Sequence, residues 1–296
     1  MKDISIDVII PTYNGMPYLK EAIASVLSQT HRQLTLYIVD DGSTDGGATK
    51  KYVKSIKDER VVYLHKKNGG QDSARNIGAQ KSTAPFVAFL DSDDVWYETK
   101  LEEQLAVIGA SSDVGMIYGL CDYIDEHGRK VGELGFNRSG KLFNYLLRAN
   151  KITGSASMVL IRRDVMKRLG YFREDLLVAE DWALWMEIAQ VSIILCVNKK
   201  LAALRVRSDS MQTDYQKMAK GLYYMYPVML KSLHLSFRQK TIFAAACLGD
   251  ATYFYVLSGN KTAARKCFRA MLFASPLSFL LLSPRRYSVY VRVLKS

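Results

Sequence analysis

An open, mostly parallel α/β sheet flanked by helices, followed by a helical C-terminal region, is the fold that this sequence predicts. Apolar segments alternate with amphipathic segments through the first half, which is the pattern of strand, helix, strand units. At 296 residues and 49% hydrophobic composition, the chain can bury a large core. After Arg207 the apolar spacing becomes helical. We therefore expect a sheet domain over residues 1–211 and a basic helical region over residues 212–296.

Each element has its own local signal. Five apolar segments predict buried strands: residues 4–10, 34–39, 61–64, 85–90 and 114–119. Pro17 suits the first turn of a helix that runs to about residue 29. The sequence from Cys121 predicts a hairpin that turns at residues 126–129, and then a helix near residues 141–149. Apolar spacing predicts three more helices, over residues 211–235, 241–257 and 261–273.

Polar or glycine-containing loops follow four of the predicted strands. Their sequences are PTYNG, DDGSTDGG, HKKNGGQDSARN and DSDD. Because ligands bind at the carboxyl ends of the strands in open α/β sheets, the four loops are expected to meet at one crevice. The last loop places Asp91, Asp93 and Asp94 within four positions, where unpaired carboxylates would raise one another's pKa. A cation or a network of donors is therefore expected beside them.

The net charge of +12 originates in the last third of the chain. Residues 1–198 contain 24 Lys and Arg against 26 Asp and Glu, whereas residues 199–296 contain 17 against 3. Such a region suits a polyanionic partner. Its apolar content, without a nucleic-acid-binding motif, favours an anionic membrane surface over nucleic acid. For residues 263–294, an interfacial helix pair and a soluble helical bundle packed on the sheet domain are equal alternatives.

The sequence argues against secretion and against a zinc site. Strand-like sequence begins at Ile4, which leaves no room for a signal peptide. The apolar run over residues 271–283 contains Pro276 and is too short to span a bilayer. The four cysteines are far apart, without a CxxC pair. We expect a cytoplasmic protein, held peripherally at the inner face of the membrane if the basic region binds lipid.

Five motifs, in order along residues 4–209, resemble those of glycosyltransferase family 2, the inverting enzymes with one nucleotide-binding domain of the GT-A type. They are DVIIPTYNG at 7–15, DDGSTDG at 40–46, NGGQDSARNIG at 68–78, FLDSDD at 89–94 and AEDWALWMEIA at 179–189. Each motif is weak alone, but five at this spacing are specific. The resemblance implies a GT-A fold with a donor-binding half over about residues 1–120 and an acceptor-binding, catalytic half over about residues 121–211.

The resemblance also implies donor-binding residues. Thr12 and Tyr13 would contact the nucleotide base, and Asp41 would accept a hydrogen bond from the base's ring N–H. Asp40 is assigned a structural role. The alternatives are a core position for Tyr13 and a helix cap for Asp41. Arg75 would lie near the diphosphate or the base, or else would be a surface or salt-bridged arginine.

The family's D-x-D motif corresponds to residues 91–93. Strand alternation would point Asp91 and Asp93 to the same side, and oxygen ligands select Mg²⁺ or Mn²⁺. The ion would bridge the donor's phosphates, with Asp93 as the direct ligand and Asp91 reaching ribose or metal-bound water. Asp94 is assigned to capping a helix that begins near Tyr97.

Relatives commonly carry an Arg-x-His step after the last strand, and this chain departs from it. Its sequence there is Arg205-Val206-Arg207. Arg207 would therefore replace a possible metal ligand, or would neutralise the donor's diphosphate directly.

The family's E-D motif corresponds to Glu180 and Asp181, and it implies that Asp181 removes a proton from the acceptor hydroxyl. A well-placed general base contributes about 10² to 10⁴ in rate. The alternative is that Asp181 is an acid at a helix start, favourable to the helix dipole. Trp182 and Trp185 would stack the acceptor or would belong to the core.

Taken together, these implications predict an inverting, metal-dependent glycosyltransferase. It would move one sugar from a nucleotide-diphosphate donor, expected to be a UDP-sugar, to a glycan or polyprenyl-linked acceptor in cell-surface polysaccharide assembly. The Q-x-x-R-W motif and membrane helices of processive relatives are absent, which favours single-sugar transfer. The alternatives are a sugar-phosphate nucleotidyltransferase, which would show a Gly- and Arg-rich first loop in place of PTYNG, and a non-catalytic nucleotide-sugar-binding scaffold.

Overall fold

The chain forms two compact units in this computed structural model, which describes residues 4–108, 113–152, 155–207, 214–274 and 276. The first unit contains residues 1–142, 152–174 and 191–207. The second contains residues 143–151, 175–190 and 208–296. The boundary predicted at residues 211 and 212 lies outside the described residues.

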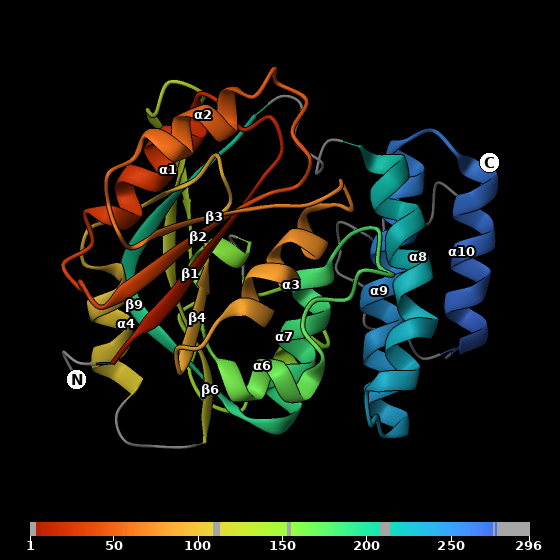
Figure 1. The fold of residues 1–296 in the computed structure, drawn as a ribbon. Helices are drawn as coiled ribbons and strands as arrows, with labels where there is room; N and C mark the ends of the chain where they lie inside the picture. Colours follow the sequence, from red (N-terminus) through yellow and green to blue (C-terminus); the bar gives the residue numbers. More distant parts are fainter. Residues whose placement is uncertain (1–3, 109–112, 153–154, 208–213, 275, 277–296) are drawn as a thin grey trace. The chain divides into compact units, whose positions relative to one another are not determined.

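A nine-stranded sheet is the centre of the first unit (Figure 1). The strand order is β3-β2-β1-β4-β8-β6-β9-β5, with β7 paired to β6. The parallel pairs are β1 with β2, β1 with β4, β2 with β3, and β6 with β9. The bounds are β1 Ile6–Thr12, β2 Leu34–Asp40, β3 Val61–His65, β4 Phe86–Phe89, β5 Val95–Trp96, β6 Val114–Ile124, β7 Lys130–Leu134, β8 Leu160–Arg162 and β9 Ile193–Arg205. The predicted α/β fold class is confirmed.

The predicted strands are present with small changes of extent. β1 begins and ends two residues later than predicted, and β6 continues past residue 119 to Ile124, where it becomes the first strand of the hairpin with β7. Asp125 N donates a hydrogen bond to Arg129 O over 2.9 Å, which closes the predicted turn at residues 126–129. β8 inserts antiparallel between β4 and β6, a pairing that the sequence pattern did not predict.

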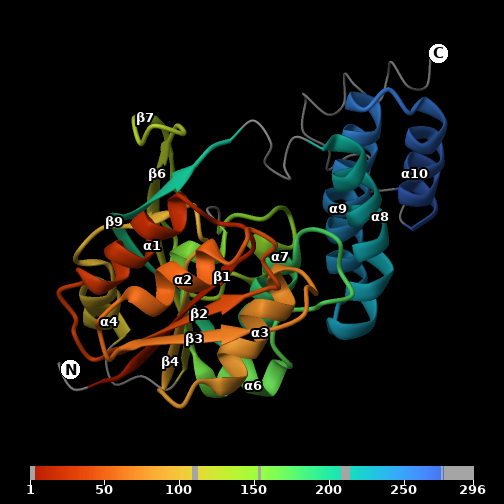
Figure 2. The same ribbon diagram turned by 45° about the horizontal axis from the view of Figure 1, so that its top comes forward.

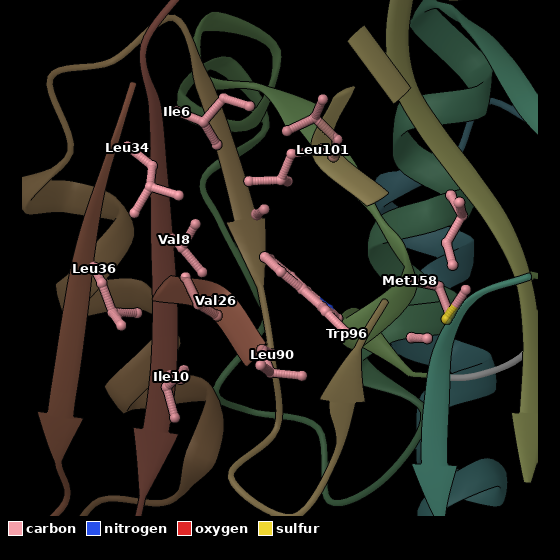
Figure 3. Packing of buried hydrophobic residues seen from close by; sticks show 14 of the residues in the cluster. Ile6, Val8, Ile10, Val26, Leu34, Leu36, Leu90, Trp96, Leu101 and Met158 are labelled. Carbon is pink, nitrogen blue, oxygen red and sulfur yellow. The ribbon is translucent and has the colours of Figure 1, made fainter. Parts of the chain in front are cut away.

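Helices of the first unit cover both sides of the sheet. Their bounds are α1 Tyr18–Leu27, α2 Ala48–Ser55, α3 Gln71–Lys81, α4 Lys100–Ile108 and α6 Arg163–Leu169, with a short 3₁₀ helix, η1, at Ala156–Met158. Residues of α1, α2 and α4 share one core cluster with Ile6, Val8 and Ile10 of β1. Figure 3 shows Trp96 and Met158 in the same cluster. Alternate residues of β1 thus point to one side.

Helix α3 packs on the other side of β1. A Cβ atom on Gly78 would lie 2.6 Å from two side-chain carbons of Ile9, so only glycine allows this close approach. Figures 1 and 2 both show α3 lying beside the carboxyl ends of β1 and β2. The NGGQDSARNIG segment therefore combines a loop at the sheet edge with a helix held tightly against it.

The second unit is helical. It contains α5 Phe143–Leu146, most of α7 Glu180–Val191, and the helices α8 Tyr215–Ser232, α9 Phe237–Leu257 and α10 Lys261–Ala274. α9 begins with a capping box, in which Ser236 and Gln239 each bond the other's backbone N–H. Residues 241–249 of α9 are all buried, because α8 and α10 both pack against it. In the part of the chain that the structure describes, none of the helices is long and apolar enough to cross a bilayer.

Candidate functional site

The carboxyl ends of β1, β2 and β3 lie at the same edge of the sheet. Thr12 is paired with Asp40, and Asp40 is paired with His65. β4 also runs parallel to β1 and ends nearby, since Leu90 N donates to Ile9 O over 3.0 Å. The four polar loops predicted to meet at one edge therefore do so.

Residues 91–94 form a turn, which we call the acidic turn. Asp94 N donates to Asp91 O over 3.0 Å, and β5 begins only at Val95. The expectation that Asp91 and Asp93 alternate along a strand is therefore wrong. The three carboxylates are instead placed by a reversal of the chain between β4 and β5.

Asp91 is bound by Arg75 of α3. The guanidinium Nη2 lies 2.5 Å from Asp91 Oδ1, and Nη1 lies 2.9 Å from Asp72 Oδ1. The Arg75 side chain is 2% exposed and its guanidinium lies 5.3 Å from the centroid of the Phe172 ring. Arg75 is thus a buried, salt-bridged cation attached to the acidic turn and not a surface residue. Its contact with a donor stays a prediction.

Asp93 lies near a second arginine. Arg207 Nη1 is 3.7 Å from Asp93 Oδ2, and its guanidinium lies 5.5 Å from the centroid of the Tyr18 ring. Burial raises the pKa of Asp93, the charge on Asp91 raises it further, and Arg207 opposes both effects. A positive charge from the Arg205-Val206-Arg207 step therefore stands beside the acidic turn.

Asp94 has a different role from the helix cap assigned to it. Its Oδ2 accepts a hydrogen bond from Ser157 Oγ over 2.6 Å, and its Oδ1 accepts one from Arg205 N over 2.9 Å. The side chain is buried, and α4 begins only at Lys100. Burial and the neighbouring carboxylates Asp91 and Asp93 raise the pKa of Asp94 well above its usual range. Asp94 holds the acidic turn to β9 and η1 instead of capping α4.

Asp41 organises the glycine loop before α3. Its two carboxylate oxygens accept hydrogen bonds from Gly69 N and Gly70 N over 2.9 and 2.7 Å, and Lys66 Nζ lies 2.5 Å from Oδ1. Gly70 has φ +92°, a conformation that favours glycine. Asp40 binds Ser43 N and the hydroxyl of Tyr63, which is a structural role as expected. Contact of Asp41 with a base stays a prediction.

The first loop combines a buried hydroxyl with an exposed aromatic ring. Thr12 is 3% exposed and its Oγ1 has no hydrogen-bond partner in the described structure. Tyr13 is 49% exposed, as its proposed stacking requires. Asn14, with φ 51°, bonds Thr44 through both its amide oxygen and its amide nitrogen. The loops after β1 and β2 are therefore fastened to each other while the Tyr13 ring stays accessible.

The acidic turn has the chemistry of a site that shares a cation with a diphosphate. Within the described ranges, no cluster of three or more His, Cys, Asp or Glu side chains could hold an ion alone. Mg²⁺ is usually bound by one or two carboxylates together with substrate phosphates, and the pair Asp91 and Asp93 suits that arrangement. The unpartnered Thr12 hydroxyl is a further polar atom at the same sheet edge. The residues therefore fit Mg²⁺ or Mn²⁺ that binds with the donor.

Asp181 is the second residue of α7, in the second unit. Its Oδ2 accepts a hydrogen bond from Asn150 Nδ2 over 3.2 Å and its Oδ1 accepts one from Trp182 N over 2.6 Å. The side chain is half-buried, and Ala179, just before α7, has φ 59°. Backbone in this rare region often marks a functional position. The role of Asp181 as a base stays a prediction.

Trp182 and Trp185 belong to the core of the second unit. They are 3% and 0% exposed. Trp182 Nε1 donates to Leu146 O over 2.7 Å, and its ring meets the ring of Phe243 at 69° with a centroid distance of 6.1 Å. Neither ring is available for stacking on an acceptor, so of the two alternatives the core position is correct.

Comparison with known proteins identifies the family. The family model described as "Glycosyl transferase family 2" matches residues 7–170, more than half of the chain. The chain belongs to glycosyltransferase family 2. The matched range contains the first four of the five sequence motifs and the complete acidic turn.

Curated relatives within the family differ in length from this chain. An uncharacterized glycosyltransferase of Rickettsia bellii is 32% identical over 244 residues, which are 80% of this chain and 34% of the relative. A putative teichuronic acid biosynthesis glycosyltransferase of Bacillus subtilis, TuaG, is 29% identical over 75% of this chain and 86% of the relative. The chain thus spans about a third of the length of the rickettsial protein.

Solved structures show the same fold. The crystal structure of S. aureus TarS residues 1–349 in complex with UDP-GlcNAc has a TM-score of 0.69 at 20% identity, and the match covers 97% of this chain and 84% of that one. The mannosyltransferase PcManGT from Pyrobaculum calidifontis, in complex with GDP-Man and Mn²⁺, has a TM-score of 0.63 at 18% identity, with 96% and 83% covered. The fold is therefore that of a GT-A glycosyltransferase.

Three residues at the site were missed by the sequence reasoning. Asn14 could have been found, because Asn is among the residues that tolerate a left-handed turn. Ser157 and Asn150 lie in a segment with no motif, and their hydrogen bonds to Asp91 and Asp181 depend on tertiary structure alone.

Proposed function

We propose that this chain is an inverting glycosyltransferase that moves a single sugar from a nucleotide-diphosphate sugar to a hydroxyl of a glycan or lipid-linked acceptor. The carrying observation is the acidic turn at the sheet edge, with Arg75 joined to Asp91 and Arg207 beside Asp93. Carboxylates and arginines together suit a diphosphate that binds with a divalent cation. The exposed ring of Tyr13 suits a base.

The donor is proposed to be a UDP-sugar and the product a cell-surface polysaccharide. A complex of TarS with UDP-GlcNAc supports the first, and the teichuronic acid relative supports the second. Asp91 and Asp93 would hold Mg²⁺ or Mn²⁺, and the Mn²⁺ complex of PcManGT supports this. When bound, the ion stabilises the negative charge that develops on the departing diphosphate.

The chemical step is a direct displacement at the anomeric carbon. The acceptor oxygen forms a bond to that carbon, the bond to the diphosphate breaks, and its electron pair leaves on the phosphate oxygen. Asp181 takes the proton of the acceptor hydroxyl as general base. Asn150 holds one oxygen of this carboxylate. Arg75 and Arg207 supply fixed positive charge for the diphosphate.

The test is a thermal-shift screen of nucleotide sugars with Mn²⁺ and Mg²⁺, followed by transfer assays with the donor that binds. We expect one UDP-sugar to raise the melting temperature in the presence of the metal, and UDP to be released on transfer. Binding without turnover on any acceptor or water would indicate the scaffold. Release of pyrophosphate from a sugar phosphate and a nucleoside triphosphate would indicate the nucleotidyltransferase.

We further propose that the basic C-terminal helices bind an anionic membrane surface; of the predicted segment 263–294, residues 275 and 277–294 lie outside the described residues. Residues 214–274 contain nine Lys and Arg against two Asp. On α10, Lys266, Arg269 and Phe273 are exposed at helical spacing, with Phe273 94% exposed, while Cys267 and Met271 are buried. Basic and aromatic side chains on one side of a helix suit lipid headgroups.

Liposome flotation tests this surface. The full chain is expected to float with vesicles that contain anionic lipid and not with neutral vesicles. Each surface cation contributes about 1 kcal/mol to binding, and salt should weaken binding because it screens these charges. Lys266→Glu with Arg269→Glu should release the protein. Lys50→Glu with Lys54→Glu, on α2 of the sheet unit, is the matched charge control. Equal flotation of both double variants would contradict the assignment to α10.

A further inference from the structure

A single buried hydroxyl fixes the acidic turn at both ends. Ser157 Oγ, on η1, accepts a hydrogen bond from Asp91 N over 3.0 Å and donates one to Asp94 Oδ2 over 2.6 Å. The side chain of Ser157 is 0% exposed. Because one hydroxyl bonds the first and last residues of the turn, their separation is set by this contact.

The other side of the turn is fixed by Arg205 at the end of β9. Arg205 N donates to Asp94 Oδ1 over 2.9 Å and Arg205 Nε donates to Asp93 O over 2.9 Å. Its guanidinium also pairs with Glu21 Oε2 at 2.7 Å and lies 4.5 Å from the centroid of the Tyr18 ring. The backbone that carries Asp93 is therefore tied to both α1 and β9.

The segment that presents Ser157 is itself constrained. Ser155 has φ 60°, a left-handed conformation that is rare outside glycine, and its Oγ accepts from Ser157 N over 3.2 Å. Trp96 Nε1, from β5 just after the turn, donates to Ser157 O over 2.8 Å. Rare backbone held by surrounding bonds is typical of functional sites. The hydroxyl of Ser157 thus binds the acidic turn, and its carbonyl accepts a hydrogen bond from Trp96, just after the turn.

We infer that Ser157, Asp94 and Arg205 form a positioning network that holds Asp91 and Asp93 in the arrangement needed to bind a divalent cation together with the donor's diphosphate. This inference rests on the proposed function. Ser157 and Asp94 are buried and act only through the turn, so they are positioning residues, and Asp91 and Asp93 make the contact. Side chains that already have the binding arrangement bind an ion and a diphosphate more tightly, because they lose less conformational entropy on binding.

The test compares Ser157→Ala with Ser25→Ala in the full chain. Ser25 is the matched control, because its buried hydroxyl also accepts from a backbone N–H of β5, that of Trp96 over 3.1 Å, without bonding the acidic turn. Calorimetry measures the affinity for UDP with and without Mn²⁺, and circular dichroism measures the melting temperature.

We expect Ser157→Ala to weaken UDP binding in the presence of Mn²⁺ by about tenfold, which is about 1.4 kcal/mol, and to change binding without Mn²⁺ much less. Ser25→Ala should lower the melting temperature but keep both affinities. Ser157→Cys, of similar volume, should give an intermediate affinity and supplies a folded variant if Ser157→Ala is unstable.

Two results would overturn the inference. If wild type binds UDP with Mn²⁺ and the Ser157 variants bind equally well, the network is structural only and the proposed function stands. If wild type does not bind any nucleoside diphosphate with Mn²⁺ or Mg²⁺, the proposed function and the inference fail together.

Discussion

The Nζ atom of Lys100 lies 4.0 Å from the centroid of the Trp96 ring, inside the core of the sheet unit. Lys100 is 0% exposed, and its Nζ donates to Gln104 Oε1 over 2.8 Å. Burial lowers the pKa of Lys100 well below its ordinary value of 10.5. Below pH 10.5 Lys100 is protonated in the unfolded chain, whereas in the folded chain it stays neutral until the pH falls to its lower folded pKa. The free energy of unfolding therefore decreases as the pH falls from 10.5 toward the folded pKa.

We predict that Lys100→Met stabilises the protein. The loss of a partner for Gln104 opposes the gain, so we expect an increase in melting temperature of about 2–4 °C at pH 7, equivalent to roughly 1 kcal/mol. The difference from wild type should grow as the pH falls below 10.5, as thermal unfolding at a series of pH values would show. Lys50→Met, on the exposed side of α2, is the control. A difference that is constant over this range would contradict the assignment of a charge penalty to Lys100.

Asp93→Asn should separate metal binding from nucleotide binding. The amide keeps the shape of the side chain and removes its charge, so UDP binding in the presence of Mn²⁺ should weaken by about 10- to 100-fold. Chelation of the metal with EDTA should bring wild type to the same affinity as the variant. Asp125→Asn, in the β6–β7 turn, changes the same group away from the site. If Mn²⁺ strengthened UDP binding by Asp93→Asn as much as it strengthens binding by wild type, residues other than Asp93 would be the metal ligands.

Asp181→Asn should abolish proton removal and leave donor binding intact. Sugar transfer is expected to fall by about 10² to 10⁴, while the UDP affinity measured by calorimetry stays at the wild-type value. Glu180→Gln is the informative comparison, because it removes the neighbouring acid of the same helix turn. If both variants lose thermal stability but keep the wild-type rate of sugar transfer, Asp181 interacts favourably with the dipole of α7 and the general base is another residue.

Arg207→Ala should weaken the diphosphate contact. A charge-assisted bond to phosphate is lost, so UDP binding with Mn²⁺ is expected to fall by about tenfold, and Arg207→Lys should restore part of it. Arg129→Ala, an exposed arginine of the hairpin turn, is the control. Arg207→His tests the alternative role: tighter Mn²⁺ binding in that variant would show that the arginine stands where a metal ligand can be accommodated.

The sequence predicted those features that depend on local patterns. The strands β1 to β4 and the loops after them followed from apolar segments and turn residues, and the hairpin followed from its turn at residues 126–129. The pairing of strands that lie far apart in the sequence was harder to predict. The insertion of β8 between β4 and β6 has no local signal, because an antiparallel partner can come from any short apolar segment.

The same limit applies within the site. Asp91 and Asp93 lie beside the guanidinium groups of Arg75 and Arg207, and their binding of a metal ion stays a prediction. Asp94 was assigned to a helix cap because local rules favour Asp before a helix. The structure instead gives Asp94 partners more than sixty residues away in sequence. Trp182 shows the converse: a motif suggested acceptor stacking, and packing against Phe243 makes it core.

The dependence of the acidic turn on Arg205 has a consequence for biosynthesis. Asp94 leaves the ribosome more than a hundred residues before Arg205, whose backbone N–H completes its hydrogen bonds. Until Arg205 has emerged, the acidic turn lacks the backbone N–H that binds the Asp94 carboxylate and the guanidinium that binds the Asp93 carbonyl. The acidic turn of a nascent chain therefore gains these hydrogen bonds only when Arg205 is available, after β1 to β8 have been synthesised.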